Sequence, residues 1–202
     1  MLKIYARCAP AVFLLFTLSI LLIRAQPYDD SALRAFMIPP PGCAAPCWMG
    51  VRPGVTHVDE AIRLLEAHEW VRAVHKSGAF YDLEWSGTQP AWIDTGFPNH
   101  FRASALIVES IRLRTHVTVG AVFLTMGRPQ SGAINSPLNM AGLRHTGRYT
   151  LNGMEINSLT RCPIGHDSVW RTTVEIHYRA RAVDYYPYHF NLGDWLALRP
   201  CR

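Results

Sequence analysis

The stretch PGVTHVDEAIRLL, residues 53–65, carries the clearest local signal in this chain of 202 residues. Pro53 and Gly54 favour a turn, and Thr56 followed three residues later by Asp59 is a pattern typical of a capped helix start. The apolar residues that follow recur at spacings of three and four, which places them on one face of a helix. We therefore expect an amphipathic helix over about residues 57–68, with Thr56 as its N-cap.

A second stretch, VTVGAVFLTMGRP at residues 117–129, repeats this pattern. Thr118 is its expected cap, and Gly127 with Pro129 ends it. Strand-like segments follow each helix, at 70–75, 80–85 and 105–115 in the first half and at 148–159 and 168–178 in the second; residues 86–102 are expected to form a loop. The fold class is therefore α+β, with two helix-plus-antiparallel-sheet units at 43–116 and 117–202. An internal duplication and the coincidence of two unrelated capped helices both remain open.

The two stretches resemble the opening motif of the SmpA/BamE-like envelope family, and residues 124–129 also resemble the ending of that motif. A tandem pair of such units is similar to the architecture of the β-lactamase inhibitor protein family. The resemblance implies a non-enzymatic α+β module that binds protein outside the cytoplasm.

The N-terminal residues 1–25 have the pattern of an export signal. Lys3 and Arg7 precede an uninterrupted run of fifteen mostly apolar residues, APAVFLLFTLSILLI, at 9–23. A charged start followed by an apolar run is typical of a secretory signal, although the run is short for a membrane-spanning helix. Two outcomes remain open: cleavage after Ala25, or retention as a signal anchor that binds the membrane with the domain outside. Residues 26–42 are expected to form a proline-rich spacer, with a short helix near 32–36.

The composition is that of a globular domain, with 49% hydrophobic and 17% charged residues. The formal charge is +5, but Lys3, Arg7 and Arg24 belong to the leader, which leaves 17 basic against 15 acidic residues. These basic residues are scattered along the sequence, whereas a nucleic-acid interface requires a basic stripe. We therefore expect no nucleic-acid partner.

Four cysteines lie beyond the leader: Cys43, Cys47, Cys162 and Cys201. An even number of cysteines in an exported chain favours disulfides over metal binding or redox chemistry. Of the three pairings that four cysteines allow, we expect Cys43–Cys47 and Cys162–Cys201.

No catalytic motif, metal site or cofactor site is expected, because the sequence has none of the standard nucleophile, zinc or phosphate-loop patterns. Residues 184–191, DYYPYHFN, instead suggest a recognition surface, with Tyr185, Tyr186, Tyr188 and His189 as its contact residues. The predicted function is an extracytoplasmic protein-interaction module, membrane-tethered, secreted or periplasmic. The alternative is a cell-envelope hydrolase with an unrecognised active site.

Overall fold

The computed structural model describes residues 2–25, 29–135, 141–165 and 167–180, and divides the chain into two units, residues 1–32 and 33–202. The first unit contains the helix α1 (Leu2–Ala25), with Pro10 inside it. Within the described part of the chain, no helix combines the length and the apolarity that a membrane crossing requires.

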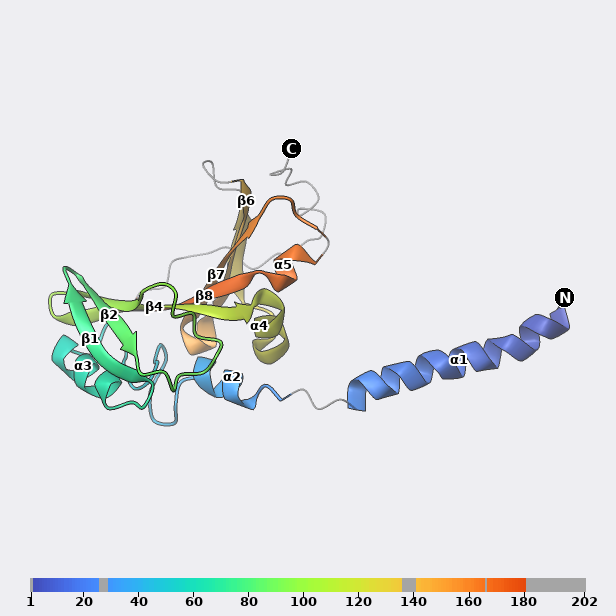
Figure 1. The fold of residues 1–202 in the computed structure, drawn as a ribbon, viewed down its shortest axis with the longest axis horizontal. Helices are drawn as coiled ribbons and strands as arrows, with labels where there is room; N and C mark the ends of the chain where they lie inside the picture. The colour runs from blue at the N-terminus through green and yellow to red at the C-terminus, as the bar shows by residue number, and fades with distance from the viewer. Residues whose placement is uncertain (1, 26–28, 136–140, 166, 181–202) are drawn as a thin grey trace. The chain divides into compact units, whose positions relative to one another are not determined.

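The second unit is built on one antiparallel sheet of eight strands, in the order β1-β2-β3-β4-β8-β7-β6-β5 (Figure 1). The two central strands, β4 (Ile107–Thr118) and β8 (Thr173–Arg179), pair with each other and so join the two halves of the chain. The other strands are β1 (Val71–Ser77), β2 (Phe80–Trp85), β3 (Asn99–Ser104), β5 (Ser131–Asn135), β6 (Gly142–Tyr149) and β7 (Met154–Arg161).

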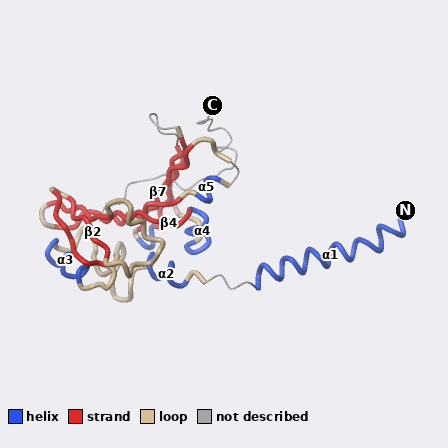
Figure 2. The backbone as a smooth tube through the Cα atoms, viewed as in Figure 1, coloured by secondary structure: helices blue, strands red, loops and turns tan. Residues whose placement is uncertain are grey.

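Two helices precede the two sets of strands, and both lie on the same side of the sheet (Figure 2). The helix α3 (Val58–Glu66) contacts β1 and β4, and α4 (Val119–Met126) contacts β4 and the short helix α5 (Ser168–Arg171). The remaining helical elements are α2 (Ser31–Met37) and the 3-10 turn η1 (Thr150–Asn152). The chain thus follows the order helix, then four strands, twice.

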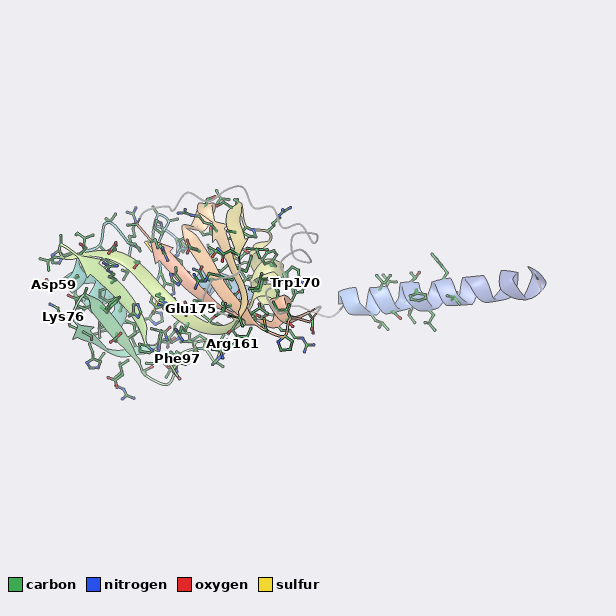
Figure 3. All side chains as sticks on the ribbon, turned by 90° about the horizontal axis from the view of Figure 1, so that it is seen from above. Asp59, Lys76, Phe97, Arg161, Trp170 and Glu175 are labelled. Atoms are coloured by element: carbon green, nitrogen blue, oxygen red, sulfur yellow. A yellow bond between two sulfur atoms is a disulfide. The ribbon has the colours of Figure 1, made fainter. Side chains whose placement is uncertain are left out.

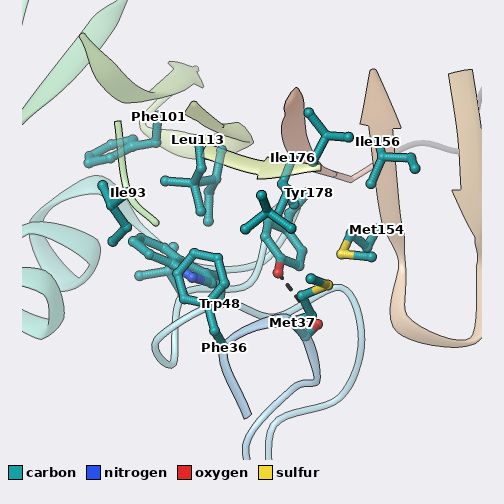
Figure 4. Packing of buried hydrophobic residues seen from close by; sticks show 14 of the residues in the cluster. Phe36, Met37, Trp48, Ile93, Phe101, Leu113, Met154, Ile156, Ile176 and Tyr178 are labelled. Carbon is teal, nitrogen blue, oxygen red and sulfur yellow. Dashed lines mark hydrogen bonds between the residues drawn. The ribbon is translucent and has the colours of Figure 1, made fainter. Parts of the chain in front are cut away.

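The hydrophobic core lies on the side of the sheet that α3 and α4 cover. There the sheet packs against residues 36–48, which precede α3. Leu113, Ile156 and Ile176 point from three neighbouring strands towards Phe36, Met37 and Trp48 (Figure 4). The hydroxyl of Tyr178 donates a hydrogen bond to the carbonyl oxygen of Met37, at 3.4 Å. Because residues 36–48 and both halves of the sheet share these contacts, they form one packed body.

A disulfide closes the loop at residues 43–47, which precedes α3. Cys43 and Cys47 are bonded, with 6.1 Å between their Cα atoms, as the sequence predicted. Pro46 in this loop packs on the turn before β7: a Cβ atom added to Gly153 would lie 2.6 Å from the Cβ atom of Pro46. The second predicted pair, Cys162–Cys201, includes a residue outside the described part of the chain and stays a prediction.

The predicted cap of the first helix is wrong by one residue. His57 is the N-cap of α3, and its Nδ1 atom accepts a hydrogen bond from the backbone NH of Asp59. The hydroxyl of Thr56 instead accepts from the backbone NH of Arg52, at 2.8 Å, so it fixes the preceding turn. The second cap is confirmed, because Thr118 accepts from the backbone NH of Ala121 at 3.2 Å.

The strand predictions need four further corrections. The expected loop at 86–102 contains the start of β3, and β5 was not predicted at all. The segment 148–159 spans parts of two strands, β6 and β7, because η1 and Gly153 form a turn inside it; Gly153 has a φ of 60°. The segment 168–178 begins with α5 before it becomes β8. The predicted α+β class is confirmed, but all eight strands belong to one sheet.

Candidate functional site

The side of the sheet opposite α3 and α4, here called the open face, is polar. On β4, the buried Ile111 and Leu113 alternate with Arg112 and Arg114. Because successive side chains of a strand point to opposite faces, the arginines lie away from the core. The same alternation on β8 places Glu175, His177 and Arg179 on the open face.

The strand register places these residues in a row across the sheet. Arg112 is the cross-strand partner of both His100 and His177. Residues directly opposite each other on neighbouring strands are close enough for their side chains to interact. From β2 to β6, the row consists of Asp82, His100, Arg112, His177, Glu155 and Arg148.

Glu175 is the central anion of this face. Its Oε2 atom accepts hydrogen bonds from Nη2 and Nε of Arg112, at 2.7 and 3.1 Å, and its Oε1 atom lies 3.1 Å from Nε of Arg114. Burial by itself would raise the pKa of Glu175, but the hydrogen bonds from His177 and Arg112 and the nearby arginine charges outweigh it and lower the pKa to about 2. Glu175 is therefore ionised at neutral pH.

A second group of polar contacts continues from β8 to β6. Nη2 of Arg179 lies 3.6 Å from Oε1 of Glu155, and 3.1 Å from Nδ1 of His177. The side-chain amide of Asn157 donates to Glu155 at 2.9 Å, and Asn157 in turn accepts from the hydroxyl of Thr146 at 2.8 Å. These contacts hold the side chains of three neighbouring strands in fixed positions, which is the preorganisation that a recognition surface needs.

Two adjoining hollows open on this face, of about 670 and 650 Å³, and they share Arg112, His177 and Arg179. The first hollow extends over β3 and β4 towards Gly54, and the second extends over β8, β7 and β6. Six arginines line the two hollows together, against three carboxylates: Arg102, Arg112, Arg114, Arg144, Arg161 and Arg179, with Asp94, Glu109 and Glu175. The lining of the two hollows therefore carries a net positive charge.

An exposed aromatic side chain lies beside the second hollow. The guanidinium of Arg114 lies 4.5 Å from the centre of the Phe97 ring, which is 55% exposed. The buried Asn99 anchors the loop that carries Phe97, because its amide donates to the carbonyl oxygen of Asp94 and its side-chain oxygen accepts from the backbone NH of Arg114. Figure 3 shows Phe97 with Glu175 and Arg161 in one region of the molecule. The site thus offers an apolar contact next to its charged groups.

The arrangement is suited to binding anionic groups. Arginine presents a planar set of donors that fits a carboxylate or a phosphate. Burial and then the charge of Arg112 lower the pKa of His100, so this histidine is neutral at pH 7 and adds no charge of its own. Within the described residues, no group of three or more histidine, cysteine, aspartate or glutamate side chains is placed to hold a metal ion.

The structure tests few of the site residues that the sequence singled out. The four contact residues predicted at 185–189 lie outside the described part of the chain. The sequence also missed the open face, since its basic residues are scattered along the chain and gather only when β4 pairs with β8. The alternating segments IRLR at 111–114 and IHYR at 176–179 were the signal that could have shown it.

Comparisons with models of protein families, with curated proteins and with solved structures found no match to this chain. The resemblance to SmpA/BamE-like repeats therefore stays a prediction, and any function must be argued from the open face itself.

Proposed function

We propose that this chain is an exported module that binds another protein with the open face of its sheet. The observation that carries the proposal is the pair of adjoining hollows, which six arginines line on a face that α3 and α4 leave uncovered. Arginine is enriched at protein interfaces and among the residues that contribute most of the binding energy. The open face has both the charge and the fixed side-chain positions for this role.

Export is supported by two features. The N-terminal residues have the pattern of a secretory signal or signal anchor, and the disulfide Cys43–Cys47 suits an oxidising compartment. The proposed location is therefore outside the cytoplasm, either secreted or periplasmic after cleavage, or held at the membrane by the uncleaved N-terminal residues.

We also infer that the second unit arose by internal duplication. The order of elements supports this: α3 precedes β1 to β4, α4 precedes β5 to β8, and the last strand of each half pairs with the other at the centre of the sheet. Two equivalent halves joined through their last strands produce a broad sheet whose open face spans both, and a broad face suits a protein partner better than a small molecule.

Site-specific photocrosslinking in the native cells tests the binding proposal. A photoreactive p-benzoylphenylalanine replaces Thr173, which lines the second hollow, or Arg63, which is exposed on α3. We expect a discrete protein adduct from position 173 and none from position 63. Adducts formed equally from both positions, or from position 63 alone, would contradict binding through the open face.

The mass of the intact native protein tests the compartment. A chain that starts at Gln26 in the soluble fraction indicates cleavage, and a full-length chain in the membrane fraction indicates a signal anchor. Reduction and alkylation count the disulfides in the same sample. A full-length chain in the soluble cytoplasmic fraction with free thiols at Cys43 and Cys47 would contradict export.

A further inference from the structure

Four of the six arginines in the hollows have a carboxylate partner within the protein. Arg102 lies 3.3 Å from Glu109, and Arg179 lies 3.6 Å from Glu155. Arg112 and Arg114 share Glu175, as described above. These contacts balance most of the charge in the first hollow and at the centre of the sheet.

Arg144 and Arg161 differ from the other four. Neither side chain has an ion pair or a hydrogen bond to another side chain within the described part of the chain, and both are exposed. A guanidinium group with no counter-charge is available to a ligand without the cost of breaking an existing pair. The second hollow therefore contains two cationic groups that no side chain in the described ranges neutralises.

The two arginines are neighbours on the open face. Arg144 on β6 pairs with Leu159 on β7, and Arg161 follows Leu159 by two residues. Such diagonal positions on adjacent strands lie roughly 7–8 Å apart or somewhat less, within reach of long side chains. The guanidinium groups can thus bind one carboxylate together or two carboxylates side by side. Leu159, directly opposite Arg144, offers an apolar surface beside them.

The rest of the face indicates which anion fits. Glu175, Asp94 and Glu109 are interspersed with the arginines, so the positive charge is broken into separate spots. A nucleic-acid backbone or a sulfated glycan carries closely spaced charges and requires a continuous basic track. A protein loop can place one or two carboxylates at defined positions and keep the rest of its surface neutral.

We propose that the second hollow binds an acidic loop of the partner protein, whose aspartate or glutamate carboxylates pair with Arg144 and Arg161. This inference rests on the proposed function of the open face and adds the chemistry of the partner. The hollow of about 650 Å³ has room for several side chains, and Asn157 and Thr173 supply further polar contacts at its wall.

A binding assay with a defined acidic probe tests the inference. The natively expressed protein, purified in detergent, is titrated into a fluorescein-labelled peptide of alternating glutamate and glycine, and anisotropy reports binding. A peptide with glutamine at each glutamate position is the neutral probe. The variant Arg144→Ser/Arg161→Ser is compared with Arg63→Ser/Lys76→Ser, which removes two positive charges from exposed positions that line neither hollow.

We expect Arg144→Ser/Arg161→Ser to weaken binding of the acidic peptide at least tenfold, and the matched control to weaken it less than twofold. The neutral peptide should bind neither the natural protein nor either variant. Equal losses in both variants would mean that the peptide senses only net charge, and no loss in the first variant would mean that these arginines are not the site. Stronger competition by oligo-dT or heparin than by unlabelled acidic peptide, at equal charge, would identify a polyanion site instead.

Photocrosslinking separates the two levels of the proposal. If Thr173→p-benzoylphenylalanine still captures its partner when Arg144 and Arg161 are both serine, the open face binds protein but not through these arginines. If position 173 gives no specific adduct in the otherwise unchanged protein, the proposed function itself fails.

Discussion

The carboxylate of Glu175 lies between Arg112 and Arg114 on the neighbouring strand, and within 3.5 Å of His177. Without this anion, two arginines would repel each other on a partly buried surface. Sixty-three residues separate Arg112 from Glu175 in the sequence. No local pattern relates the two residues, so only the strand register could reveal their contact.

Replacing Glu175 with glutamine should lower the free energy of unfolding at pH 7 and change its acid dependence. The pKa of Glu175 is lowered from 4.5 to about 2 in the folded protein, so its contribution is present above pH 4.5 and is lost as the pH falls towards 2. Urea unfolding between pH 7 and pH 2.5 should show a smaller acid-induced loss in Glu175→Gln than in the natural protein. Glu84→Gln is the control, because Glu84 also pairs with an arginine and a histidine but is more exposed than Glu175. Equal effects of the two substitutions would contradict this account.

His145 should make the protein sensitive to mildly acidic pH. This side chain is 1% exposed, and burial lowers its pKa from 6.5 to about 4. The unfolded chain therefore takes up a proton below pH 6.5 that the folded chain takes up only near pH 4, so stability falls as the pH decreases across this window. A shift of this size corresponds to a loss on the order of 3 kcal/mol.

The measurement is the free energy of unfolding at pH 7, 6, 5 and 4 for the natural protein and for His145→Gln. The variant is expected to lack the decrease between pH 6.5 and pH 4, although the substitution also lowers its stability at pH 7. If both proteins show the same slope over this window, His145 is protonated in the folded state and the argument is wrong.

At the scale of the elements, the sequence predicted correctly the helix α4, whose start, face and end depend on neighbouring residues. The helix α4 has a capping threonine, an apolar face and a glycine end, and its bounds Val119–Met126 match the expectation. The strands β3 and β5 were missed because NHFRAS and SGAIN have little intrinsic strand preference. Both are strands because β4 and β6 offer them backbone partners, and such partners cannot be identified from a short window of sequence.

The turn between η1 and β7 should tolerate no side chain. Gly153 has a φ of 60°, and Pro46 of the disulfide loop occupies the space where a Cβ atom would lie. Gly78 has a similar φ of 63° but nothing within 4 Å of that position, so it is a matched control. Gly78→Ala should cost about 1 kcal/mol through backbone strain alone.

Gly153→Ala should cost clearly more, about 3 kcal/mol, because the disulfide loop must also move. Thermal unfolding of both variants gives the comparison. If Gly153→Ala and Gly78→Ala lower the stability of the natural protein by the same amount, Pro46 does not pack on this turn in solution.

At the scale of the whole molecule, the pairing of β4 with β8 makes one sheet from two halves. Ile176 on β8 is the register partner of Leu113 in the first half and of Ile156 in the second, and all three are fully buried. The open face exists only because of this pairing, since Arg112 comes from one half and Glu175 from the other. The sequence indicated the two halves, but the open face forms only when the halves pair in the folded protein.

Ile176→Ala should therefore destabilise both halves together. Removing this buried side chain leaves a cavity at the centre of the sheet, and we expect a loss of about 2–5 kcal/mol. Amide hydrogen exchange should then quicken by the same factor in β2 and in β6, because the two halves unfold as one cooperative unit. Ile134→Ala on the edge strand β5, where Ile134 is only partly buried, is the control and should have a smaller effect. If exchange quickens in β6 and β7 but not in β1 and β2, the halves are independent folding units. The pairing of β4 with β8 would then not couple the unfolding of the two halves that form the open face.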